Sequence, residues 1–257
     1  MTALAELVGL AGQVLWLHAV VFLRAGPVMS LFPGFGDQGL PVRIRLMLAL
    51  MLTAVTAPAI APGPDGALAG LPPPVWLLVT ETGIGLLLGI GLRLFLIVLQ
   101  TAGAMAAQAM SLSQIAGGAA AEPMPAMGHF LVMGGLALAF ALGLHVRAAE
   151  MMILSYDLFP LGQPPAVAAV AGWGVARVAH TFGLAFTLAA PFVIVSVLYN
   201  LTLGIINRAM PQLMVVFVGA PVITGAGLVL LMLLAPMMLT LWMEALSAFI
   251  ANPLGAG

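Results

Sequence analysis

Long apolar stretches, separated by short clusters of proline and glycine, dominate the pattern along the chain. A helix needs roughly 20 apolar residues to cross a hydrocarbon core about 30 Å thick. Backbone groups inside lipid must hydrogen-bond within their own segment, which favours helices. The pattern therefore predicts an all-α integral membrane protein. Its candidate apolar helices are at about Leu7–Met29, Arg45–Ile60, Val75–Met110, Phe130–Leu142, Val175–Ile206 and Leu213–Ile250.

The breaks between these stretches contain residues that stop helices or turn the chain. They read FPGFGDQGLP, PAIAPGPDGALAGLPPP, GGAAAEPMP and FPLGQPP. All are short, so we expect a single membrane domain over residues 1–257 without a sizeable extramembrane part. Val75–Met110 and Leu213–Ile250 are too long for one perpendicular crossing. We expect these two to be tilted, kinked or folded into hairpins against other proteins.

Composition supports this class and narrows the chemistry. Charged residues make up only 6% of the chain, against about 25% in soluble domains, so its surface must face membrane lipid or other subunits. The net charge of −1 argues against nucleic acid as a partner. The absence of cysteine excludes disulfides and thiol catalysis.

The residues that could carry catalysis are scattered. Four histidines form no HExxH motif, and no Ser/His/Asp set, phosphate loop or carboxylate pair is visible. We therefore predict no enzymatic activity, no catalytic residue, no metal and no cofactor. The histidines are His18, His129, His145 and His180.

One apolar stretch contains both charges and glycines. Glu81 and Arg93 are twelve residues apart, roughly 18 Å along a helix, too far for a direct pair. A charge inside a membrane is a functional candidate, but we favour a position near helix ends or against a partner. Gly85 and Gly89 form a GxxxG pair, which allows close helix packing. The pair fits a subunit interface and packing within the chain equally well.

A polar stripe follows later in the chain. At helical spacing Asn200, Gly204, Asn207 and Arg208 share one side of an apolar helix, and Pro211–Gln212 then break or bend the chain. Such a stripe is costly to bury against lipid, so it should face protein or water. An interface, a substrate path and a hairpin bend all remain open.

The segment Ser111–Pro125, reading SLSQIAGGAAAEPMP, joins two apolar stretches. Its glycines make the backbone permissive. On composition it is either an ordinary connector or a movable element of a channel.

The polar stripe also carries a family resemblance. Tyr199–Gly227 resembles the FliR family of flagellar biosynthesis proteins and its injectisome relatives, with the pattern N-x-x-L-G-x-x-N-R-x-x-P-Q followed by G-x-P. It is matched at Asn200, Leu203, Gly204, Asn207, Arg208, Pro211, Gln212, Gly219 and Pro221. Nearer the start, the resemblance rests on Arg24, Pro33, Pro41, Arg43 or Arg45, Leu48 and Ala49. Further matching stretches read QTAGAMAAQAMSLS and SYDLFPLG, so nearly the whole chain is covered and the likeness leans flagellar.

The resemblance implies one copy of this chain in a hetero-oligomeric export gate with FliP and FliQ subunits. It implies helical hairpins resembling a fusion of FliP-like and FliQ-like units, approximately 1–125 and 126–257. FlhB and FlhA would be further partners, unfolded flagellar proteins the substrates, and the bacterial inner membrane at the flagellar basal body the location. The expected pore plug comprises Ser111, Leu112, Ser113, Gln114, Ile115, Ala116, Gly117, Gly118, Glu122 and Pro123.

Three alternatives stand beside this hypothesis. The first is an injectisome subunit of the same family. The second is a small-solute transporter, which would need mid-membrane polar groups and repeated halves. The third is a membrane-embedded enzyme, which would need a nucleophile and base.

Overall fold

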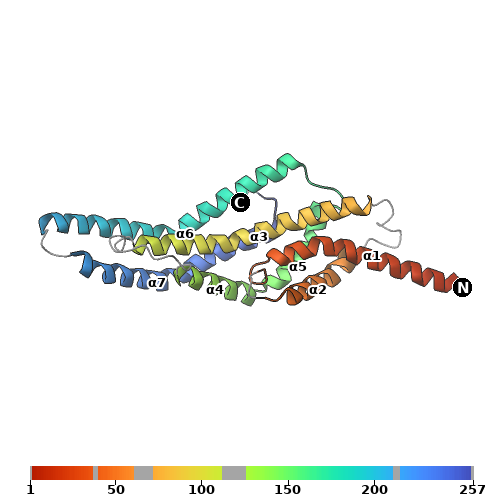
Figure 1. Ribbon diagram of the computed structural model, residues 1–257, viewed down its shortest axis with the longest axis horizontal. Helices are drawn as coiled ribbons and strands as arrows, with labels where there is room; N and C mark the ends of the chain where they lie inside the picture. Colours follow the sequence, from red (N-terminus) through yellow and green to blue (C-terminus); the bar gives the residue numbers. More distant parts are fainter. Residues whose placement is uncertain (1, 37–39, 61–71, 112–125, 211–214, 256–257) are drawn as a thin grey trace. The chain divides into compact units, whose positions relative to one another are not determined.

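The computed structural model describes residues 2–36, 40–60, 72–111, 126–210 and 215–255. Over these residues every regular element is an α-helix, which confirms the predicted all-α class (Figure 1). The helices are α1 (Thr2–Leu31), α2 (Val42–Ile60), α3 (Pro74–Ser111), α4 (Ala126–Ala141), α5 (Leu144–Leu158), α6 (Val167–Ala209) and α7 (Val215–Ala251).

Six of these helices correspond to the predicted apolar stretches, and α5 was missed. Its sequence LHVRAAEMMILSYDL places Arg147, Glu150 and Asp157 among apolar residues, so it contains no long apolar run. Gly143 precedes it with φ 79°, a left-handed conformation that glycine adopts without strain. A turn that only glycine makes easily therefore separates α4 from α5.

Five helical segments are long and apolar enough to cross a membrane, which confirms an integral membrane protein. They are Ala11–Leu31, Val42–Ile60, Pro74–Met110, Val167–Ala209 and Pro221–Ala251. The pair α4 and α5 meets the same criteria only when taken together. Of the two over-long stretches, the first is one helix, α3, and the second contains α7, which continues through Pro221 and Pro236.

By their contacts the residues form two compact units, which we describe separately. Unit 1 comprises Met1–Arg93, Leu142–Val175 and Ala248–Ala256, and unit 2 comprises Leu94–Ala141 and Ala176–Ser247. The sub-units 1–125 and 126–257, inferred from the resemblance, stay a prediction.

In unit 1 the first part of α3 lies directly on α1. A methyl group added at Gly85 would overlap the carbonyl oxygen of Arg24, and one added at Gly89 would lie 3.1 Å from the Pro27 carbonyl oxygen and from Leu31. Helix α2 packs against α1 and α5. The absent side chains at Gly85 and Gly89 allow this close approach of two backbones.

Unit 2 combines close glycine contacts with a buried tryptophan. A methyl group at Gly103 would overlap the Gly128 backbone, so α3 and α4 pack closely where these two glycines meet. Trp242 of α7 is fully buried, and its Nε1–H donates to the Phe95 carbonyl oxygen over 2.8 Å. Helices α6 and α7 meet where Gly219 faces the Tyr199 side chain. A methyl group added at Gly219 would overlap the Tyr199 hydroxyl, so α6 and α7 lie close together at this point.

Candidate functional site

A buried ion pair joins α1 to α3 in unit 1. The Nε and Nη2 atoms of Arg24 lie 2.8 Å and 2.7 Å from Oε2 of Glu81. Both side chains have 0% exposure. Two opposite charges inside apolar helices thereby neutralise each other, which greatly lowers the cost of removing them from water.

The C-terminal end of α5 satisfies the rest of the guanidinium group. Nη1 of Arg24 donates to the Ser155 carbonyl oxygen over 2.9 Å and to its hydroxyl over 3.1 Å, and Nη2 donates to the Phe159 carbonyl oxygen over 2.9 Å. The Tyr156 ring lies 3.7 Å from the guanidinium carbon, in cation–π geometry. Carbonyl groups at a helix C-terminus carry partial negative charge, so they favour a cation here.

The other carboxylate oxygen of Glu81 is hydrogen-bonded to the connector between α5 and α6. Oε1 of Glu81 accepts a hydrogen bond from the Gly162 backbone N–H over 3.0 Å, and the Gly162 carbonyl accepts one from Trp76 Nε1 over 3.0 Å. Gly162 has φ 73°. We call Arg24, Glu81, Ser155, Phe159 and Gly162 the Arg24 cluster. It ties two membrane helices to α5 and its connector.

This geometry suits a structural role better than proton transfer. Both oxygens of Glu81 and all three nitrogens of Arg24 have partners. The sequence interpretation considered Glu81 with Arg93 and did not find its true partner, which lies 57 residues earlier. A signal was available, because Arg24 and Glu81 are opposite charges in two separate apolar stretches, and each needs a partner.

The predicted interface residues divide into two groups. Gly85 and Gly89 contact α1 of the same chain. On α6, Asn200, Asn207 and Arg208 are exposed, and a methyl group at Gly204 would meet nothing within 4 Å. Pro211 and Gln212 lie outside the described residues.

The polar stripe on α6 is exposed, and its first residue, Asn200, is hydrogen-bonded within the chain. Asn200 donates to the Ser196 carbonyl oxygen over 2.9 Å, and Ser196 in turn donates to the Ala109 carbonyl oxygen of α3 over 2.6 Å. Beside the stripe, Leu201 and Ile205 are 63% and 64% exposed. The exposed part of α6 thus mixes amide groups with large apolar side chains.

The predicted plug begins where α3 ends. Ser111 is the last residue of that helix, and nothing of its side chain is described. The remaining plug residues, Leu112 to Pro123, lie outside the described residues, so the plug stays a prediction. Across the part of the chain that is described, acidic and histidine side chains form no group of three that could hold a metal ion.

Comparison with known proteins gives consistent matches. The family described as "Bacterial export proteins, family 1" matches residues 15–249. The "Flagellar biosynthetic protein FliR" of Caulobacter vibrioides is 35% identical over 226 residues, covering 85% of this chain and 88% of the relative. The protein of the same name from Escherichia coli K12 is 27% identical and covers 86% of each. That from Pectobacterium carotovorum is 26% identical, covering 90% of this chain and 87% of the relative.

Proposed function

The chain belongs to family 1 of the bacterial export proteins, and from this premise we propose that it is a core subunit of a flagellar protein export gate. Membership assigns it to a bacterial export apparatus, and its helices suit a membrane protein. The proposal adds that one copy joins FliP and FliQ subunits around a channel for unfolded flagellar proteins. It also places FlhB and FlhA nearby, in the inner membrane at the flagellar basal body.

The length of the apolar helices is the observation that carries this proposal. Helix α6 has 43 residues, which at 1.5 Å per residue spans about 64 Å. Even at a tilt of 40° it would rise about 49 Å, while the hydrocarbon core measures about 30 Å. Exposed apolar side chains occur from Val167, at 85%, to Leu201, at 63%. Lipid can cover only part of this surface, so other apolar protein must cover the rest.

Two further features favour this function over a solute carrier. A carrier needs polar groups free to bind its substrate near mid-membrane. Both oxygens of Glu81 are already occupied within the chain. The polar stripe on α6 instead points outward, as a contact with a neighbouring subunit requires. All three curated relatives carry a flagellar name, which favours the flagellar system over the injectisome.

Purification from native membranes tests the assembly. An affinity tag on this chain should recover FliP- and FliQ-type subunits in one complex of defined stoichiometry, because the exposed apolar surface of α6 needs cover. A chain that purifies alone, monodisperse and able to support export, would contradict the proposal.

The plug is tested separately. Deletion of Gly117–Ala121 should raise ion leakage through the assembled gate, because these residues would no longer close the resting pore. The control is a deletion of equal length, Pro62–Gly66, in another break between helices. Equal leakage for both deletions, with intact complexes, would reject the plug while leaving the export gate standing.

A further inference from the structure

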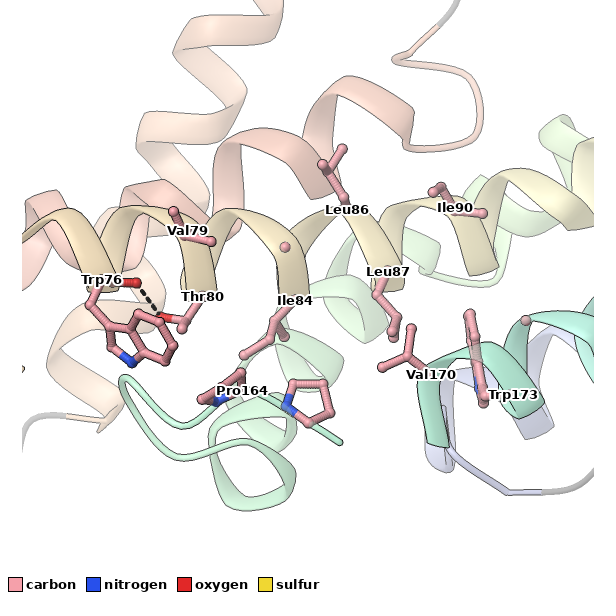
Figure 2. A pocket seen from close by; sticks show the side chains of 13 residues that line it. Trp76, Val79, Thr80, Ile84, Leu86, Leu87, Ile90, Pro164, Val170 and Trp173 are labelled. Carbon is pink, nitrogen blue, oxygen red and sulfur yellow. Dashed lines mark hydrogen bonds between the residues drawn. The ribbon is translucent and has the colours of Figure 1, made fainter. Parts of the chain in front are cut away.

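An apolar groove of about 470 Å³ runs beside α3 within unit 1 (Figure 2). One wall is α3 from Trp76 to Ile90, and the other is formed by the connector after α5 and the start of α6. In Figure 2, Ile84 and Leu87 point from α3 toward Pro164 and Val170 on the opposite wall. Both walls of the groove are therefore apolar.

The polar atoms around the groove are turned away from it or already bonded. Trp76 Nε1–H donates to the Gly162 carbonyl oxygen over 3.0 Å, and Trp173 Nε1–H donates to the Pro253 carbonyl oxygen over 2.9 Å. The Thr80 hydroxyl donates to the Trp76 carbonyl oxygen of its own helix over 3.0 Å. No charged residue is among the lining residues. An occupant must therefore be apolar along its whole enclosed length.

The dimensions suit a hydrocarbon chain. From Trp76 to Ile90 the wall is fourteen helical steps, about 21 Å, so it is long enough for an acyl chain that crosses one leaflet of about 15 Å. A helix with its side chains is about 10–12 Å across, so it would lie over such a groove and not inside it. The volume is within the common range of ligand sites.

The position of Trp76 indicates which end faces the headgroups. Trp76 is the third residue of the membrane-capable segment Pro74–Met110, and tryptophan is enriched at membrane–water interfaces. At the other end the Trp173 ring lies near Gly91, where a methyl group would be 3.3 Å from it. With Trp76 at the interface, the groove would run from there toward the membrane interior, and the Trp173 ring lines its other end.

We propose that this groove binds one acyl chain of a membrane phospholipid, with the headgroup near Trp76. The bound chain would fill the space between α3 and the start of α6. This inference goes beyond the proposed function, because it requires only that the chain lie in a membrane.

The test is photolabelling of the native complex, reconstituted into phosphatidylethanolamine and phosphatidylglycerol vesicles. The probe is a phosphatidylcholine that carries a diazirine midway along one acyl chain. Gly174 and Gly172 provide a matched pair on α6: neither has an atom within 4 Å of an added methyl group, and only Gly174 lines the groove. Gly174→Leu should fill the groove, and Gly172→Leu should leave it open.

We expect the probe to label peptides of α3 that include Ile84 and Ile90. Labelling should fall about ten-fold in Gly174→Leu, the change for displacing roughly two buried methylenes of the ligand, and remain unchanged in Gly172→Leu. Gly83→Leu, which fills the groove from the other wall, should have the same effect as Gly174→Leu. Equal labelling in all variants would overturn the proposal. So would a photoreactive side chain at Ile90 that captures a neighbouring subunit and no lipid.

Discussion

Two sets of polar residues on apolar helices, one in each unit, differ in their exposure. In unit 1, Arg24 and Glu81 are fully buried and pair with each other. In unit 2, Asn207 and Arg208 are exposed on α6, next to large apolar side chains that are also exposed. The Arg24 cluster is satisfied within the chain, whereas the polar stripe on α6 points outward.

The difference shows that a polar residue in a membrane helix does not by itself mark an interface. Its role depends on whether its hydrogen bonds are made within the chain or to a neighbour, because an unsatisfied polar group in an apolar surrounding is costly. The Arg24 cluster therefore stabilises the fold of unit 1. The α6 stripe is a surface that we propose a neighbouring subunit covers. Substitutions in the two places should separate stability from assembly.

The largest effect is expected when the buried pair loses one partner. Glu81→Ala leaves the Arg24 guanidinium buried without its carboxylate and frees the Gly162 N–H, which should destabilise the fold by about 3–5 kcal/mol. Thermal unfolding of the purified complex in detergent, together with the amount of chain in membranes, measures this.

The double variant Arg24→Met/Glu81→Leu provides the control. Because it removes both charges and keeps apolar volume, it should recover most of the stability lost in Glu81→Ala. If the single variant were as stable as the native chain, the Arg24 cluster would not hold unit 1 together.

An intermediate effect is expected at the glycines of α3. Gly85→Ala would push its methyl group into the Arg24 backbone and separate α1 from α3, at a cost of about 1–3 kcal/mol. Gly83→Ala is the matched control, because its methyl group meets nothing within 4 Å and alanine favours helix by about 1 kcal/mol. Unfolding midpoints of the two variants should move in opposite directions. Equal shifts would show that the close approach at Gly85 is unimportant.

The smallest effect on stability is expected on α6. Asn207→Leu changes an exposed side chain and should alter the free energy of unfolding by less than about 0.5 kcal/mol. It should nevertheless reduce recovery of FliP- and FliQ-type subunits with the tagged chain. Thr202→Leu, an exposed position on another side of α6, should leave recovery unchanged. Unchanged recovery in Asn207→Leu would remove this residue from the proposed interface.

The local pattern of the sequence was sufficient for the membrane class and for all the described helices except α5. Apolar stretches of helical length predicted α1, α2, α3, α4, α6 and α7, although α6 begins at Val167 and not at the predicted Val175. Hydropathy is a local property, and helices in lipid form wherever enough apolar residues follow one another. Helix α5 was missed for the same reason, because its charged residues interrupt the apolar run.

Only the tertiary structure decided which residues meet. Glu81 pairs with Arg24 across 57 residues and holds Gly162 across 81, and periodicity along one helix cannot specify such distant partners. The sequence left Gly85 and Gly89 equally suited to an interface or to internal packing, and the folded chain places both against α1. Composition determined that these helices are apolar, while the packing of the folded chain determined which side of each helix is buried and which polar groups are left facing outward.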